Sequence, residues 1–312
     1  MNMRATYPWY FTEGDEPHGY INPHALRELW LHTGTACNLA CPFCLEGSKP
    51  GDMRLQLVTR SDVLPFIDEA VALGAERISF TGGEPFLARD LPAILAYASE
   101  RCSCMVLTNG TRPLHKRLRE IEHLRHAPHR IAFRVSLDYP DEARHDAGRG
   151  RGSFKSALQG LVMLHSRGFA ISVARRGSPE ENATTVAYRF QRVFWEYGLP
   201  EDLPLIRFPD FHPPGRQVNT PAITESCMIT HHTEESRAAF MCASSRMLVK
   251  INGRMRVYAC TLVDDNPEFD LGGTLTESLA ARVMLRHHRC YSCFRFGASC
   301  SELKQPELSK AG

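Results

Sequence analysis

The sequence predicts an α/β fold: a partial (β/α)6 TIM-like barrel followed by a small C-terminal domain with a β-hairpin and many cysteines. Strand-like apolar runs alternate with helix-like stretches from residue 28 to residue 208. Such alternation is typical of parallel strands joined by right-handed helical crossovers. Six repeats, where a complete barrel has eight strands, predict that the barrel is incomplete.

The expected strands are residues 28–34, 77–81, 104–108, 131–137, 170–175 and 204–208. Ser61 is the expected N-cap of the helix between the first two strands, and Gly74 is its expected stop. The helix before the fifth strand begins at Ser153 and ends near Gly168. The helix before the sixth strand carries Phe190, Val193, Phe194 and Tyr197.

The pattern changes after residue 208. Residues 209–240 are Pro-rich at first and show no clear period, which indicates a linker or lid. Two alternating runs then flank Asn252-Gly253, the dipeptide typical of a tight hairpin. The expected divisions are an N-terminal extension, a partial barrel, a linker or lid, and a C-terminal cysteine domain, at residues 1–27, 28–208, 209–240 and 241–312.

Composition excludes several classes of protein. The chain has 312 residues and a formal net charge of +2, which gives no electrostatic reason to expect nucleic acid as a partner. No apolar stretch is long enough to span a bilayer, and the N-terminus lacks the apolar region of a secretory signal. We therefore expect a cytoplasmic protein. Its eleven cysteines, an odd and clustered set, favour metal or catalytic use over disulfides.

The first cysteine cluster is Cys37-x3-Cys41-x2-Cys44. Three thiolates so close in sequence can converge on one soft metal centre, either zinc or an iron–sulfur cluster. One alternative is a zinc knuckle that takes a fourth ligand from elsewhere, such as His32. The cluster follows the first expected strand, however, where β/α barrels place their active-site loops. The residues that follow the later strands, beginning with Thr81-Gly82-Gly83-Glu84-Pro85, belong to the same face.

The cysteine spacing, the aromatic Phe43 before the last cysteine, and Gly82-Gly83-Glu84-Pro85 together resemble the radical S-adenosylmethionine (SAM) superfamily over roughly residues 28–208. The resemblance implies a [4Fe–4S] cluster on Cys37, Cys41 and Cys44. The open iron would bind the amino and carboxylate groups of SAM. An electron from the cluster would cleave SAM to a 5′-deoxyadenosyl radical, which abstracts a substrate hydrogen. Residues 141–154 resemble a segment of the peptide-modifying members.

Individual residues fit this picture. Gly82 and Gly83 allow close backbone approach to a ligand, and Glu84 offers an acceptor for the ammonium of SAM. Phe43 offers an apolar face for adenine. By family position, Ser136 and Asp138 would contact the ribose, although either could simply end its strand. Arg175 could pair with the SAM carboxylate or be a solvated charge. The remaining expected contacts are Pro85 and Asn109, the latter also fitting a tight turn.

The second cysteine cluster is C-terminal. A two-residue turn at Asn252-Gly253 places Cys260 opposite Ser245, with Cys242 at the same open end of the hairpin. Cys290-x2-Cys293 could complete a four-thiolate site, for zinc or iron–sulfur by ligand type. The pattern resembles the twitch domain, a shortened SPASM domain with one auxiliary [4Fe–4S] cluster on Cys242, Cys260, Cys290 and Cys293. The spacing Gly-x6-Cys departs from the usual Gly-x4-Cys, and Cys300 is the substitute ligand to consider.

These resemblances predict a radical SAM enzyme that carries out a net oxidation, by dehydrogenation or crosslinking, of a small molecule or peptide, with a flavodoxin- or ferredoxin-type electron donor. One alternative is a redox-neutral epimerase in which Cys300 or Cys227 donates a hydrogen atom. A second is a non-catalytic iron–sulfur or zinc protein. Further candidates for substrate contact are Arg207, Asp210 and His212.

Overall fold

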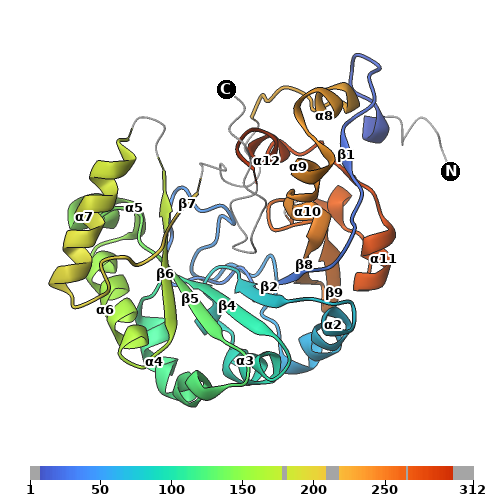
Figure 1. Cartoon of the computed structure of the whole chain (residues 1–312). Coiled ribbons are helices and arrows are strands. Elements are labelled where there is room, and N and C mark those ends of the chain that lie inside the picture. Colours follow the sequence, from blue (N-terminus) through green and yellow to red (C-terminus); the bar gives the residue numbers. More distant parts are fainter. Residues whose placement is uncertain (1–7, 178–180, 209–217, 265, 298–312) are drawn as a thin grey trace.

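One eight-stranded sheet organises the fold, with strand order β7-β6-β5-β4-β3-β2-β8-β9 (Figure 1). The computed structural model describes residues 8–177, 181–208, 218–264 and 266–297. Every pair from β8 through β2 to β7 is parallel, and β9 runs antiparallel to β8. The sheet does not close, which confirms the predicted partial barrel. Its strands are β2 (Glu28–His32), β3 (Arg77–Thr81), β4 (Ser103–Thr108), β5 (Ile131–Ser136), β6 (Ala170–Arg176), β7 (Leu205–Phe208), β8 (Ser245–Ile251) and β9 (Arg254–Tyr258).

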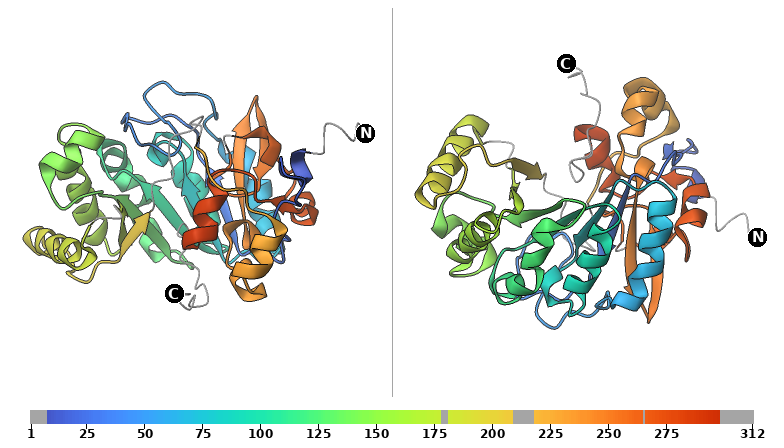
Figure 2. Two further views of the ribbon diagram at one scale, coloured as in Figure 1. Left: turned by 90° about the horizontal axis from the view of Figure 1, so that it is seen from above. Right: turned by 60° about the horizontal axis from the view of Figure 1, so that its bottom comes forward.

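Helices cover the outer face of this sheet (Figures 1 and 2). The helix α2 begins after Thr59 and not after the expected Ser61, because the Thr59 N–H donates to Asp62 in a capping box. Gly74 follows its end with a φ of 92°, as a stop signal requires. The helices between strands are α2 (Arg60–Ala72), α3 (Leu91–Ser99), α4 (Arg112–Ile121), α5 (Glu142–Arg149), α6 (Ser153–His165) and α7 (Ala183–Glu196).

Alternate residues of the strands face two different cores. In β2, Leu29 and Leu31 pack against the outer helices, whereas Trp30 belongs to a second core on the inner face. The neighbouring strand β8 repeats the pattern, with Leu248 facing outward and Met247 inward. Successive side chains of a strand point to opposite faces, so both faces of this part of the sheet are buried. C-terminal residues supply much of the inner core.

The C-terminal hairpin joins the barrel sheet. Ile251 pairs with Arg254 across Asn252-Gly253, the register that the two-residue turn predicted. Because β8 also pairs with β2, the hairpin extends the barrel sheet and does not form a separate one. The sequence predicted the hairpin but not its pairing with β2. Cys102 and Cys104, at the start of β4, are buried in the outer core.

The two ends of the described chain lie together over the inner core. The strand β1 (Tyr20–Ile21) pairs with β10 (Val283–Met284). Within the expected linker or lid, residues 218–240 contain two short helices that the sequence did not indicate, and residues 209–217 lie outside the described part. The remaining helices are α8 (Glu225–His231), α9 (Glu234–Ala238), α10 (Met241–Ser244), α11 (Leu275–Ala280) and α12 (Cys290–Phe296), and short 3-10 turns include η1 (Pro85–Leu87).

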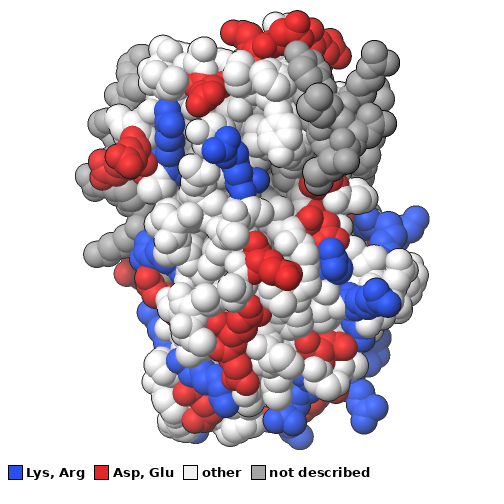
Figure 3. All heavy atoms as spheres, turned by 90° about the vertical axis from the view of Figure 1, so that its right-hand side faces the viewer, with Lys and Arg blue, Asp and Glu red and all other residues white. Residues whose placement is uncertain are grey.

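Charged side chains of both signs are interspersed on the face that carries α11 and β9 (Figure 3), as the net charge of +2 suggests. Among the described residues, no helix combines the length and the apolar character needed to cross a membrane.

If β8 is part of the barrel core, Leu248→Ala should cost about 2–5 kcal/mol of unfolding free energy, since it leaves a cavity at a fully buried site. Ile229→Ala is the control, because Ile229 is 68% exposed and should change stability by less than about 0.5 kcal/mol. Denaturant titration of both variants measures the difference. Equal effects would contradict the placement of β8.

Candidate functional site

A cavity of about 240 Å³ opens at the carboxyl ends of the barrel strands. Most of the site residues predicted between Cys37 and Arg175 line this cavity. Ten of the predicted residues line it: Cys37, Cys41, Phe43, Cys44, Gly82, Gly83, Asn109, Ser136, Asp138 and Arg175. Glu84 and Pro85 do not line it.

The cysteine loop is held by the glycine loop that follows β3. The N–H of Gly83 donates to the carbonyl of Gly34 at 2.9 Å, and that of Glu84 donates to Ala36 at 3.0 Å. A Cβ on Gly83 would lie 2.3 Å from the Ala36 oxygen. The glycines therefore permit close approach to the protein's own backbone just before Cys37. Their predicted close approach to a ligand stays a prediction, and both glycines line the cavity.

Glu84 turns away from the cavity and is fully buried. Its carboxylate accepts hydrogen bonds from the N–H groups of Phe86 and Asn109 and from the Thr108 hydroxyl. Burial raises the pKa of Glu84 to about 7, although these donors oppose the shift. In this structure Glu84 thus ties the loop after β3 to the end of β4. Its role as an acceptor for the SAM ammonium stays a prediction.

The thiols of the cysteine loop are unbridged, and burial raises the pKa of each, that of Cys37 to about 11. Buried thiols in an apolar setting stay protonated unless a cation or cluster holds them as thiolates. The Asn109 amide, part of the predicted tight turn, lies 3.9 Å from the Cys37 sulfur and donates toward it. Asn109 therefore contacts a potential ligand as well as forming the turn.

Phe43 is covered by charged groups. The guanidinium of Arg176 lies 4.0 Å from its ring centroid, and Arg149 lies 5.6 Å away. Arg149 also pairs with the buried Asp138 carboxylate at 2.6 Å. Asp138, the expected ribose contact, is thus engaged in an ion pair. Sequence reasoning gave no role to Arg149 or Arg176, although Arg149 lies within the segment 141–154 that it noted.

Arg175 lines the cavity, and its side chain is ion-paired with Glu181. This contact settles neither of the two sequence interpretations of Arg175. Arg207 is exposed in β7, and Asp210 and His212 lie outside the described residues.

The C-terminal cysteines are brought together in the inner core. Cys242, Cys260, Cys290 and Cys293 are all buried. Burial raises the pKa values of Cys242 and Cys260 to about 12 and about 11, and the three thiols at 242, 260 and 290 are close enough to influence one another. Thr261, next to Cys260, lines the cavity, so this cluster adjoins the first one. Sequence reasoning missed that contact, which depends on the pairing of β8 with β2.

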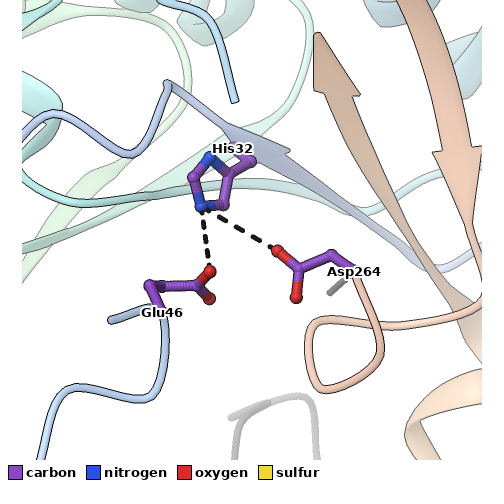
Figure 4. Close-up of side chains that lie close together, drawn as sticks. All are labelled: His32, Glu46 and Asp264. Atoms are coloured by element: carbon purple, nitrogen blue, oxygen red, sulfur yellow. Dashed lines mark ion pairs between the residues drawn. The ribbon is translucent and has the colours of Figure 1, made fainter. Parts of the chain in front are cut away.

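Of the two candidate hydrogen donors, only Cys227 falls within the described residues. Cys227 does not line the cavity and contacts the Thr224 hydroxyl at 3.2 Å in α8. Cys300 lies outside the described residues. The side chains of His32, Glu46 and Asp264 also converge (Figure 4), a grouping that sequence analysis did not predict.

The sequence profile of the Radical SAM superfamily matches residues 31–186, half of the chain. The chain belongs to the radical SAM superfamily. The match includes the cysteine loop and the glycine loop that packs on it. Radical SAM proteins are enzymes that use a [4Fe–4S] cluster and SAM, so the chain is an enzyme of this kind.

Curated relatives match less than half of the chain. The chain is 34% identical over 143 residues to a Fe-coproporphyrin III synthase of Methanosarcina barkeri, which covers 44% of this chain and 33% of that protein. It is 33% identical over 146 residues to a GTP 3',8-cyclase of Klebsiella pneumoniae, which covers 45% of this chain and 43% of that one. The chain therefore matches less than half the length of these relatives.

Solved structures resemble the chain over more of its length. One is native anSMEcpe with bound AdoMet, with a TM-score of 0.59 and 12% identity over 85% of this chain and 82% of that chain. Another is SuiB of Streptococcus suis bound to the precursor peptide SuiA, with a TM-score of 0.58 and 13% identity over 82% of this chain and 65% of that chain. At such low identity the likeness concerns the fold alone.

The contact between the two loops predicts the effect of Gly83→Ala. Its methyl group would collide with the Ala36 carbonyl, so we expect a destabilisation of about 1–3 kcal/mol and impaired iron binding by the cysteine loop. Gly14→Ala is the control, since its Cβ would meet only Thr12 Oγ1, at 3.8 Å. Iron content and unfolding free energy are the measurements. Normal values in the Gly83→Ala variant would contradict the packing argument.

His145 predicts a pH dependence of stability. It is buried, and its Nδ1 accepts the Asp138 N–H at 3.2 Å. Burial and the nearby Arg149 lower the pKa of His145 to about 4. The unfolded chain takes up this proton near pH 6.5, so the native state loses stability as pH falls from about 6.5 toward about 4.

Between about pH 7.5 and about pH 5.5, wild type should lose about 1 kcal/mol more stability than His145→Gln, which keeps an acceptor but does not titrate. Urea unfolding of both anaerobically reconstituted proteins measures this difference. Parallel losses in the two proteins would show that His145 does not titrate in this window.

Proposed function

We propose that Cys37, Cys41 and Cys44 hold the [4Fe–4S] cluster of this radical SAM enzyme. The three thiols line one cavity, as ligands of a shared group must. Three ligands leave one iron of a cubane without a protein ligand, and that iron would face the cavity. Asn109, which donates toward the Cys37 sulfur, would act as an outer-sphere donor to this cluster.

The cavity also suits SAM. The hydroxyls of Ser48 and Thr261 line it, are buried, and have no hydrogen-bond partner among the described residues. Buried polar atoms are rarely left in this state, so a bound molecule is a natural partner. We propose that Gly82, Gly83 and Ser136 contact SAM, with Arg175 or Arg176 near its carboxylate. Glu84 supports these residues from behind, since its oxygens already accept three donors.

The observation that carries the reaction type is the second set of buried cysteines beside the cavity. Cys242, Cys260, Cys290 and Cys293 would bind an auxiliary [4Fe–4S] cluster. The buried guanidinium of Arg246 interacts electrostatically with Cys242 and Cys260. A buried cation favours the thiolate form that cluster binding requires, and it offsets the negative charge of a four-thiolate cluster.

We infer a net oxidation, either dehydrogenation or crosslinking, of a small molecule or a peptide. SAM and a cluster on Cys37, Cys41 and Cys44 would supply a radical able to remove a substrate hydrogen atom. A cluster on Cys242, Cys260, Cys290 and Cys293 would supply an acceptor for the second electron of the oxidation, with a proton released to solvent. The chain's own residues exclude water from this step, because Trp30, Leu39 and Phe208 form apolar walls of the cavity. A flavodoxin or ferredoxin is the proposed electron source.

Iron and sulfide analysis after anaerobic reconstitution tests the proposal. Wild type should hold about eight irons per chain, and the Cys37/Cys41/Cys44→Ala triple variant about four, given four irons per cubane. A matched Cys102→Ala/Cys104→Ala variant should keep about eight, because these cysteines lie in the outer core. Wild type with about four irons, all lost in the triple variant, would contradict the auxiliary cluster and with it the oxidation.

A further inference from the structure

A buried polar group joins the cysteine loop to the segment that follows Cys260. His32 ends β2, Glu46 follows Cys44 in the cysteine loop, and Asp264 follows Cys260 (Figure 4). The His32 Nε2 lies 3.3 Å from a Glu46 oxygen and 3.9 Å from an Asp264 oxygen. The side chains of His32 and Asp264 are almost wholly buried, and that of Glu46 is 13% exposed. The end of β2, the cysteine loop and the distant segment after Cys260 thus meet at one ring.

The protonation of His32 decides what this group can do. Its Nδ1 accepts the N–H of Gly34 at 3.1 Å, so the neutral ring carries its proton on Nε2. A divalent metal between the three side chains would need the Nε2 lone pair. The Nε2 lies near both carboxylates but meets hydrogen-bond geometry with neither. This tautomer favours a polar contact between the loops over a metal site.

Arg289 makes a second contact between the same two loops. This residue precedes Cys290 and is 1% exposed. Its guanidinium donates to the carbonyl of Leu45, next to Cys44, and to that of Leu262, near Cys260, each at 3.0 Å. It also interacts electrostatically with Glu46 and Cys260. One buried side chain thus binds the cysteine loop and both C-terminal cysteine segments.

We propose that Arg289, together with His32, Glu46 and Asp264, positions the two clusters at a fixed separation. This inference rests on the proposed auxiliary cluster. The loops at 37–46 and 260–264 follow different strands, β2 and β9, and are joined by the contacts of Arg289 and His32. Buried charge-assisted hydrogen bonds are strong and directional, and removing one partner leaves the other uncompensated. The distance between clusters matters because electron transfer and magnetic coupling both fall steeply with it.

The test uses the anaerobically reconstituted holoprotein and needs no substrate. Arg289→Met removes both carbonyl contacts, Arg289→Lys restores a cation with donors, and Asp264→Asn weakens the contact to His32. Arg101→Met is the matched control, since Arg101 also donates to a carbonyl, that of Tyr97 at 2.9 Å, but on the outer helices. Each dithionite-reduced protein is analysed for iron and by electron paramagnetic resonance.

We expect about eight irons in every protein and a reduced spin–spin interaction in Arg289→Met and Asp264→Asn, with partial recovery in Arg289→Lys. The dipolar part of this interaction falls with the cube of the distance between the clusters. The control should match wild type. Loss of a residue that supports metal ligands typically lowers metal affinity or activity by about 10–100-fold. Iron should therefore be measured after excess metal has been removed, so that weakly bound iron is not counted.

Unchanged spectra in the variants, at full iron content, would overturn the inference while leaving the auxiliary cluster intact. Loss of about four irons in both Arg289→Met and Asp264→Asn would also overturn it, since these residues would then support cluster assembly and not distance. Stoichiometric zinc or manganese that disappears in Asp264→Asn would show a metal site instead. Wild type with about four irons would contradict the proposed function itself.

Discussion

The close packing of two backbone segments is the constraint on which the site depends. Residues 34–36 and 82–84 approach so closely that a Cβ on Gly83 would overlap the Ala36 carbonyl. Two hydrogen bonds between backbones fix the start of the cysteine loop there. Glu84 extends the connection to Thr108 and Asn109 at the end of β4. Three neighbouring strand ends therefore act as one rigid support for the Cys37 sulfur.

A second rigid wall comes from buried charge. Asp138, Arg149, Phe43 and Arg176 form a stack in which an ion pair covers an aromatic ring. Burial makes each contact dependent on the others, because a lone charge here would be costly. Arg149 also interacts electrostatically with Cys41 and Cys44. The stack thus keeps the Arg149 guanidinium beside the thiols of Cys41 and Cys44, where it would stabilise their thiolate forms.

The sequence was sufficient for what depends on local pattern. Alternation along the chain gave the six parallel barrel strands, and the position of Cys37 after β2 gave the active face. The turn Asn252-Gly253 gave the hairpin register. Pairing between β8 and β2 could not be predicted, because periodicity shows which face of a strand is buried and not which strand lies beside it. The contacts of Glu84 with Thr108 and Asn109 could not be predicted for the same reason, since these residues belong to a different strand end.

That one strand pairing explains why the two cysteine clusters are neighbours. The strand β8 lies beside β2 and carries the chain after β9 over the inner face of the sheet. The residues that follow Cys260 then cover Trp30 and Met247, where a closed barrel would bury its own strands. This covering segment brings Thr261 to the cavity and Asp264 to His32. An incomplete barrel can therefore place a second cysteine cluster beside its active face without a separate domain interface.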